Sequence, residues 1–200
     1  MLPLLFFSMS IWTLSAPPLE GTFQIEAGSK LYLVGTTNVN TFTCNCQDQF
    51  SRDAFTFQWL DAQQQTARFT NTALKIKANS FDCGGSGINR DMQKTLKADA
   101  FPHIRIRMEE ILRSGKIAIG ENWTQFKART TVTIAGVDKR VELQVKARKL
   151  KNSSFHFTAA TDLNLTDFKL EMPRPLMGMI KVNDKITIHL DLIVISGAAM

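Results

Sequence analysis

The sequence predicts an all-β protein, an extended antiparallel β-barrel of about eight strands that carries one short helix. Three observations lead to this fold class. Apolar and polar residues alternate over most of the chain, turn-forming residues separate the alternating segments, and no parallel strand-helix-strand unit is evident. A closed barrel of about eight strands can hold one small ligand.

The N-terminal half contains short alternating segments. We expect strands over residues 22–27, 31–46, 54–59 and 73–78, with the second bent or divided at Gly35. The segment 54–59 is the clearest, because three aromatic residues recur there at every second position. Residues 61–66, rich in Gln, are expected to form a polar connection.

A glycine-rich turn at residues 84–87 interrupts these strands. Asn89 is a suitable N-cap, and we expect a short amphipathic helix over about residues 88–98 that ends before Phe101-Pro102. The later strands are more regular and are predicted over residues 103–109, 123–134, 139–150, 154–165 and 185–195. Residues 135–138 are expected to turn a long hairpin.

The first 16 residues are apolar and carry no charge, and two prolines follow them, as is typical of a signal peptide; an uncleaved anchor is the alternative. We therefore expect one domain over residues 20–200 in a periplasmic or secreted protein. The Lys and Arg residues behind the net charge of +6 are scattered along the chain. This pattern favours a solvated surface over a site for anionic lipid head groups or nucleic acid.

Three cysteines fit an exported domain with one disulfide and one free thiol. Cys44 and Cys46 share a face of their predicted strand, so either can pair with Cys83. A metal site is not favoured, because no His lies near these cysteines in sequence and no fourth ligand is evident.

The aromatic residues are mostly without polar groups, with 14 Phe against one Tyr. They therefore belong in a core or an apolar pocket. The candidates for lining a ligand cavity are Phe55, Phe57, Trp59, Trp123, Phe126, Phe155, Phe157 and Phe168. The alternative for each is that it fills the barrel. His103, His156 and His189 are isolated, and we expect no catalytic residue and no metal site.

Several passages resemble the YceI-like family. These are Gly87-Ile88-Asn89-Arg90-Asp91 with Leu96, then Phe101-Pro102-His103-Ile104, the hairpin from Thr131 to Val137, Asp167-Phe168, and Val182-Asn183-Asp184-Lys185-Ile186. The resemblance covers roughly residues 28–195. The cysteine-bearing passages, Asn-Val-Asn-x-Phe-x-Cys and Phe-x-Cys-Gly, resemble the form found in exported proteins of the Bacteroidetes type.

The resemblance implies a lipocalin-like barrel and a non-enzymatic protein outside the cytoplasm. Its partner would be a long amphiphilic lipid, a polyisoprenoid or an isoprenoid quinone, carried or stored in the barrel, with no other cofactor. A transient contact with a membrane surface and a homodimer are further hypotheses. The alternative function is an exported stress-response or interaction module with a filled barrel and no lipid ligand.

Overall fold

The computed structural model describes residues 19–50, 52–61, 65–112, 118–151, 154–174 and 176–198. The leader predicted at residues 1–16 lies outside these ranges. In the described part, no helix is long and apolar enough to cross a membrane.

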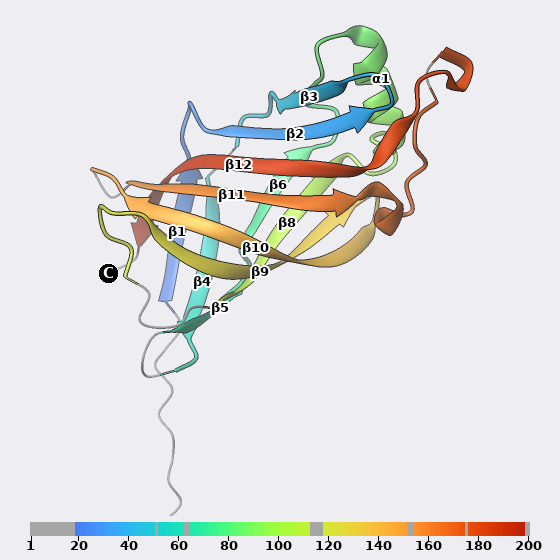
Figure 1. Ribbon diagram of the computed structural model, residues 1–200. Helices are drawn as coiled ribbons and strands as arrows, with labels where there is room; N and C mark the ends of the chain where they lie inside the picture. Colours follow the sequence, from blue (N-terminus) through green and yellow to red (C-terminus); the bar gives the residue numbers. More distant parts are fainter. Residues whose placement is uncertain are drawn as a thin grey trace, which may run out of the picture.

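The strands form one antiparallel sheet that closes on itself (Figure 1). Eight strands make the ring, in the spatial order β1, β4, β5, β8, β9, β10, β11 and β12, and β12 pairs with β1 to close it. Their bounds are β1 Leu19–Ile25, β4 Asp53–Trp59, β5 Thr66–Thr70, β8 His103–Leu112, β9 Thr124–Ile134, β10 Val137–Lys149, β11 Ser154–Asn164 and β12 Val182–Ala198. The predicted barrel of about eight strands is confirmed.

Four further strands extend the ring, because two of its strands change partners along their length. β12 pairs with β2 over its first half and with β1 over its second, and β8 pairs with β6 before it pairs with β5. The additional strands are β2 Lys30–Thr37, β3 Thr41–Cys46, β6 Ala73–Lys77 and β7 Phe81–Asp82. Because β2 and β6 pair with parts of β12 and β8 that the ring strands β1 and β5 leave free, the sheet extends beyond the eight-stranded ring.

The helix is shorter and earlier than predicted. α1 spans Ser86–Thr95, and its N-cap is Gly85. Asn89 is not the cap: its side chain reaches back to β7, where it accepts a hydrogen bond from the Cys83 N–H and donates one to Asp82. The helix ends before the Phe-Pro pair, because Lys97 takes a left-handed conformation with φ 53°.

The first strand begins earlier than predicted, and β5 was not predicted at all, since its sequence Thr-Ala-Arg-Phe-Thr has only two apolar residues. The β9–β10 hairpin is confirmed. Its turn consists of Ala135 and Gly136, both with positive φ, as in the two-residue turns that match strand twist. A side chain at Gly136 would collide with the ring of Phe101, 2.7 Å away.

One end of the barrel, which we call the capped end, is filled. α1 and the short 3-10 helix η1, Leu165–Phe168, lie there with β2, β3 and β7 (Figure 1). Leu33, Cys44, Leu96 and Phe168 are among the buried residues of this core. A second 3-10 segment, η2 at Leu176–Gly178, lies in the loop before β12.

A smaller core follows in the middle of the barrel. It consists of buried residues from β9 and β10, namely Phe126, Ala128, Leu143, Val145 and Ala147. A small apolar void of about 10 Å³ in this region is lined by Leu143, Leu190 and neighbouring side chains. The barrel is therefore packed from the capped end to its middle.

Candidate functional site

The end of the barrel opposite the cap is lined by aromatic side chains. Strand pairing shows which way they point, because residues opposite each other in the sheet share a face. Trp59 lies opposite Ala67, which is buried, and Phe57 lies opposite Phe69. On the other wall, Phe155 lies opposite Val194 of β12. Val194 is on the same face of β12 as the buried Ile186, because successive residues of a strand alternate between the two faces. These side chains therefore face the interior.

We call this set the aromatic lining. Its members are inward-facing and only half-buried, and they are Phe23, Phe55, Phe57, Trp59, Phe69, Phe155 and Phe157. At the capped end, inward-facing residues such as Leu33, Ile134 and Leu163 are buried, and Phe168 is only 1% exposed. Half-burial at inward positions means that apolar surface inside this end remains accessible.

Phe57 is the centre of the lining. Its ring centroid lies 5.6 Å from that of Phe69, 5.8 Å from that of Trp59 and 6.1 Å from that of Phe55. Across the barrel, Phe155 and Phe157 contact each other at 6.2 Å. Stacked and edge-on rings of this kind form a continuous apolar surface without hydrogen-bonding groups, apart from the indole N–H of Trp59.

The eight predicted cavity residues fall in four places, of which the outer face, with Trp123, is described below. Phe55, Phe57, Trp59, Phe155 and Phe157 belong to the aromatic lining. Phe126 is buried in the middle core, and Phe168 is buried at the capped end. Phe69 was missed because β5 was not predicted. Phe23 lies in the predicted first strand but was not singled out as a cavity residue.

Trp123 does not face the interior. It precedes β9 and lies on the outside of the barrel, 44% exposed, with its ring 5.0 Å from that of His156 and 4.8 Å from the Arg148 guanidinium. His156 points outward because Phe155 and Phe157, on either side of it, point inward. The ring contact with His156 and the cation-π contact explain why this aromatic residue is stable outside.

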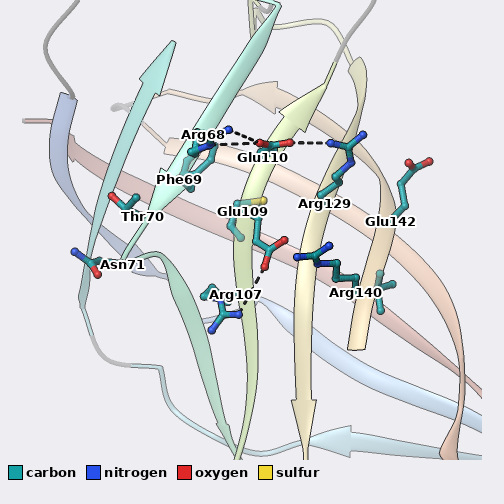
Figure 2. A pocket seen from close by; sticks show the side chains of 12 residues that line it. Arg68, Phe69, Thr70, Asn71, Arg107, Glu109, Glu110, Arg129, Arg140 and Glu142 are labelled. Atoms are coloured by element: carbon teal, nitrogen blue, oxygen red, sulfur yellow. Dashed lines mark hydrogen bonds and ion pairs between the residues drawn. The ribbon is translucent and has the colours of Figure 1, made fainter. Parts of the chain in front are cut away.

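A groove lies on the outer wall, with a volume of about 810 Å³ (Figure 2). It occupies the place where β5 leaves β8: Arg68 still pairs with Glu110, whereas Phe69 and Thr70 pair only with β4. A β-bulge at Glu109 bends β8 at the same level. The bulge and the strand separation together hollow the wall.

Charged side chains from four strands surround this groove. Glu110 of β8 forms ion pairs with Arg68 of β5 at 3.1 Å and with Arg129 of β9 at 2.8 Å (Figure 2). The hydrogen bond from Arg68 is the main cause that lowers the pKa of Glu110, and Arg129 adds to it. Glu109 accepts a hydrogen bond from Thr131 at 2.6 Å and lies 3.6 Å from Arg107.

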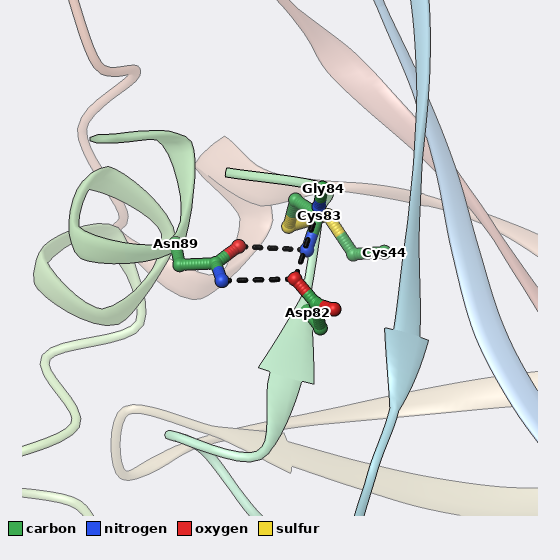
Figure 3. The surroundings of a disulfide bond; sticks show 5 residues. All are labelled: Cys44, Asp82, Cys83, Gly84 and Asn89. Atoms are coloured by element: carbon green, nitrogen blue, oxygen red, sulfur yellow. Dashed lines mark hydrogen bonds between the residues drawn. A yellow bond between two sulfur atoms is a disulfide. The ribbon is translucent and has the colours of Figure 1, made fainter. Parts of the chain in front are cut away.

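The disulfide joins Cys44 to Cys83 (Figure 3). Asn45 pairs with Asp82, so the next residues along the two strands, Cys44 and Cys83, stand opposite each other. Cys46 remains free. The disulfide thus ties the start of the α1 segment to β3 at the capped end, away from the aromatic lining.

In the part of the chain that the structure describes, no cluster of side chains for metal binding accompanies these features. Among the described residues, no group of three or more His, Cys, Asp or Glu side chains is placed to hold a metal ion. Among the residues that the structure describes, His156 and Asp191 form the one hydrogen-bonded pair of a histidine with a carboxylate. They lie 2.6 Å apart on the outer face, beside Trp123.

Solved structures share this fold. The match to BcnA of Burkholderia cenocepacia has a TM-score of 0.62 at 19% identity and covers 85% of this chain and 99% of that one. A polyisoprenoid binding domain from Saccharophagus degradans, implicated in plant cell wall breakdown, matches with a TM-score of 0.62 at 14% identity, over 88% and 98% of the two chains. The YCEI protein of Campylobacter jejuni matches with a TM-score of 0.52 at 18% identity, over 78% and 84%.

At these identities the solved structures support the fold alone, and the family assignment comes from the sequence. No curated protein matches the chain significantly. The model of the YceI-like domain matches residues 21–194, which include all or most of every strand of the closed ring. The chain therefore belongs to the family of proteins with a YceI-like domain.

Proposed function

We propose that the protein binds a long isoprenoid lipid, without catalysis, in the end of the barrel formed by the aromatic lining. The observation that carries this proposal is the half-burial of inward-facing aromatic residues around Phe57. Apolar side chains of a barrel that served only stability would be packed, as Leu33, Val132 and Leu163 are at the capped end. A hydrocarbon tail laid against these rings would remove their remaining apolar surface from water.

The family and one structural neighbour support the class of ligand. The Saccharophagus domain with the same fold is described as polyisoprenoid binding. An isoprenoid tail requires an apolar surface with few polar groups, and the aromatic lining meets this requirement. Because the middle core is filled, the tail would lie at the aromatic end and would not run through the whole barrel.

We also propose that the protein acts outside the cytoplasm. The Cys44–Cys83 disulfide supports this location, because disulfides persist in oxidising compartments such as the periplasm. A carrier there would take lipid from a membrane or store it, and this role needs only binding and release.

Extraction of the purified protein with organic solvent, followed by mass spectrometry, tests the proposal. We expect an isoprenoid lipid in the extract, or binding of a polyprenol or an isoprenoid quinone when one is offered to lipid-free protein. A protein that carries no lipid and binds neither compound would exclude the proposed function.

A second candidate function is an interaction module. It is favoured by three exposed apolar residues at the capped end, Val39, Met177 and Met179, with exposed fractions of 66% or more. Asn38 holds their two loops together by hydrogen bonds to Met179 and Lys181. An exposed apolar surface of this kind is typical of a contact with a protein, a second copy of the chain or a membrane.

The two candidates are separated by substitution. Met177→Ser together with Met179→Ser would abolish a partner contact or self-association and leave lipid binding unchanged. A protein that associates through these loops and never binds lipid would support the interaction module in place of the lipid carrier.

A further inference from the structure

The outer groove carries more positive than negative charge. Its lining includes Arg68, Arg107, Arg129 and Arg140 against Glu109, Glu110 and Glu142. Glu142 also forms an ion pair, at 2.7 Å, with Lys127, which lies outside the groove. Because Lys127 compensates the charge of Glu142, the net positive charge of the groove is larger than the count of its lining residues indicates. The groove is therefore an electropositive depression in a protein whose net charge is already +6.

Arg140 is the arginine of the groove that is most available to a ligand. Its side chain projects from β10 at the rim, is exposed, and has no hydrogen bond or ion pair to any described residue. Figure 2 shows it across the groove from Asn71, on the same level as Arg107. Arg68 and Arg129 share the single carboxylate of Glu110, so this pair also has a positive charge in excess.

The groove adjoins the aromatic lining through one residue. Phe69 belongs to the lining of the groove and also stacks on Phe57, the centre of the aromatic lining. Met108, the other inward-facing residue at this level of β8, lines the groove as well and remains half-buried. An apolar path thus begins between the charged rim and continues over Phe69 to Phe57.

A charged rim beside an apolar path matches one kind of molecule, an amphiphile with an anionic head and a hydrocarbon tail. The guanidinium group of arginine binds phosphate and carboxylate oxygens through paired N–H donors. A neutral head group would leave this positive charge uncompensated.

We infer that the groove binds the anionic head group of the lipid, so that the preferred ligand is an isoprenoid phosphate and not a neutral polyprenol or quinone. This inference rests on the proposed function, because it assumes that the tail lies on the aromatic lining. Arg140 is assigned as the main contact for the head group, with Arg107 and Arg129 beside it.

Farnesol and farnesyl phosphate test the inference, because they share one tail and differ in the head group. Their affinities are measured with lipid-free protein by titration calorimetry, with inorganic phosphate as a third arm. The variants are Arg140→Gln and, as a matched control, Arg105→Gln. Arg105 is also exposed and without an ion pair among the described residues, but it lies on β8 outside the groove.

We expect farnesyl phosphate to bind at least tenfold more tightly than farnesol, the size of effect that one charge-assisted hydrogen bond produces. Arg140→Gln should remove most of this preference and leave the affinity for farnesol unchanged, whereas Arg105→Gln should change neither. Raising the ionic strength should weaken the preference, because the rim is exposed.

Other results would overturn the inference in distinguishable ways. Equal affinities for both compounds, unaffected by Arg140→Gln, would exclude the head-group site and leave the proposed function intact. Inorganic phosphate that binds as tightly as farnesyl phosphate would make the groove a site for free anions, without a role for a tail. Binding of neither farnesol nor farnesyl phosphate would contradict the proposed function itself.

Discussion

The ring of Phe55 lies over Gly21 on the neighbouring strand. The two residues face each other across the β1–β4 pair, and a Cβ atom on Gly21 would stand 2.6 Å from the Cζ atom of Phe55. The absence of a side chain at Gly21 lets the ring lie against the barrel wall. Phe55 therefore lines the aromatic end without filling it.

Gly21→Val should reduce the capacity for lipid while the barrel still folds. The new side chain would displace the Phe55 ring toward the interior, at a cost of about 1–3 kcal/mol in unfolding free energy. Titration with a polyprenol measures the binding, and thermal unfolding measures the stability. Gly120→Ala is the control, because a Cβ atom at Gly120 meets no atom within 4 Å. Undiminished lipid binding by Gly21→Val would show that this space is not used.

Phe57→Ala and Phe168→Ala should have opposite profiles. Phe57 is half-buried and contacts three rings of the lining, so its loss should weaken lipid binding about tenfold or more with a moderate loss of stability. Phe168 is 1% exposed at the capped end, so its loss should cost about 3–5 kcal/mol of stability. Lipid binding by the folded fraction of Phe168→Ala should remain. Equal binding defects in both variants would remove the distinction between the two ends.

Loss of the disulfide should destabilise the capped end. Cys83→Ser opens a cross-link between residues 39 apart in sequence, which should cost about 4 kcal/mol if the chain-entropy model holds. Denaturant unfolding of Cys83→Ser and Cys44→Ser, compared with Cys46→Ser, measures this effect. Cys46 is free, so its substitution should change stability little.

Lowering the pH should reduce the free energy of unfolding, because Glu110 in the wall of the groove becomes protonated and loses its ion pairs. Its folded-state pKa lies below the ordinary value of 4.5, chiefly because of the hydrogen bond from Arg68. The resulting stabilisation is present above pH 4.5 and is lost as the pH falls through the lowered folded-state pKa. Glu110→Gln should therefore be less stable than the natural protein at pH 7, by at most about 1 kcal/mol, and the difference should shrink in acid. A difference that stays constant with pH would contradict this ion-pair account.

The barrel could be predicted from sequence because its signal is local. Alternation in segments such as residues 139–150 fixes which side chains face inward, and five of the eight predicted cavity residues indeed belong to the aromatic lining. β5 escaped prediction because Ala67 and Phe69 alone give too short a pattern, although both face inward once β5 pairs with β4.

The remaining features depend on pairing between distant strands. Cys44 and Cys46 share a strand face, and only the register of β3 against β7 selects Cys44 as the partner of Cys83. The groove requires β5, β8, β9 and β10 to lie side by side, with a bulge at Glu109. Trp123 is a large aromatic residue, as cavity residues often are, but its position before β9 places it on the outer face beside His156.

Photo-crosslinking with a polyprenol analogue that carries a diazirine in its tail tests the central claim most directly. After irradiation and proteolysis, mass spectrometry identifies the labelled peptides. We predict labels on β4, β5 and β11, at or next to Phe57, Phe69 and Phe155, and competition by unlabelled polyprenol. Labels confined to the capped-end loops around Met177, or no specific label at all, would contradict lipid binding in the aromatic end of the barrel.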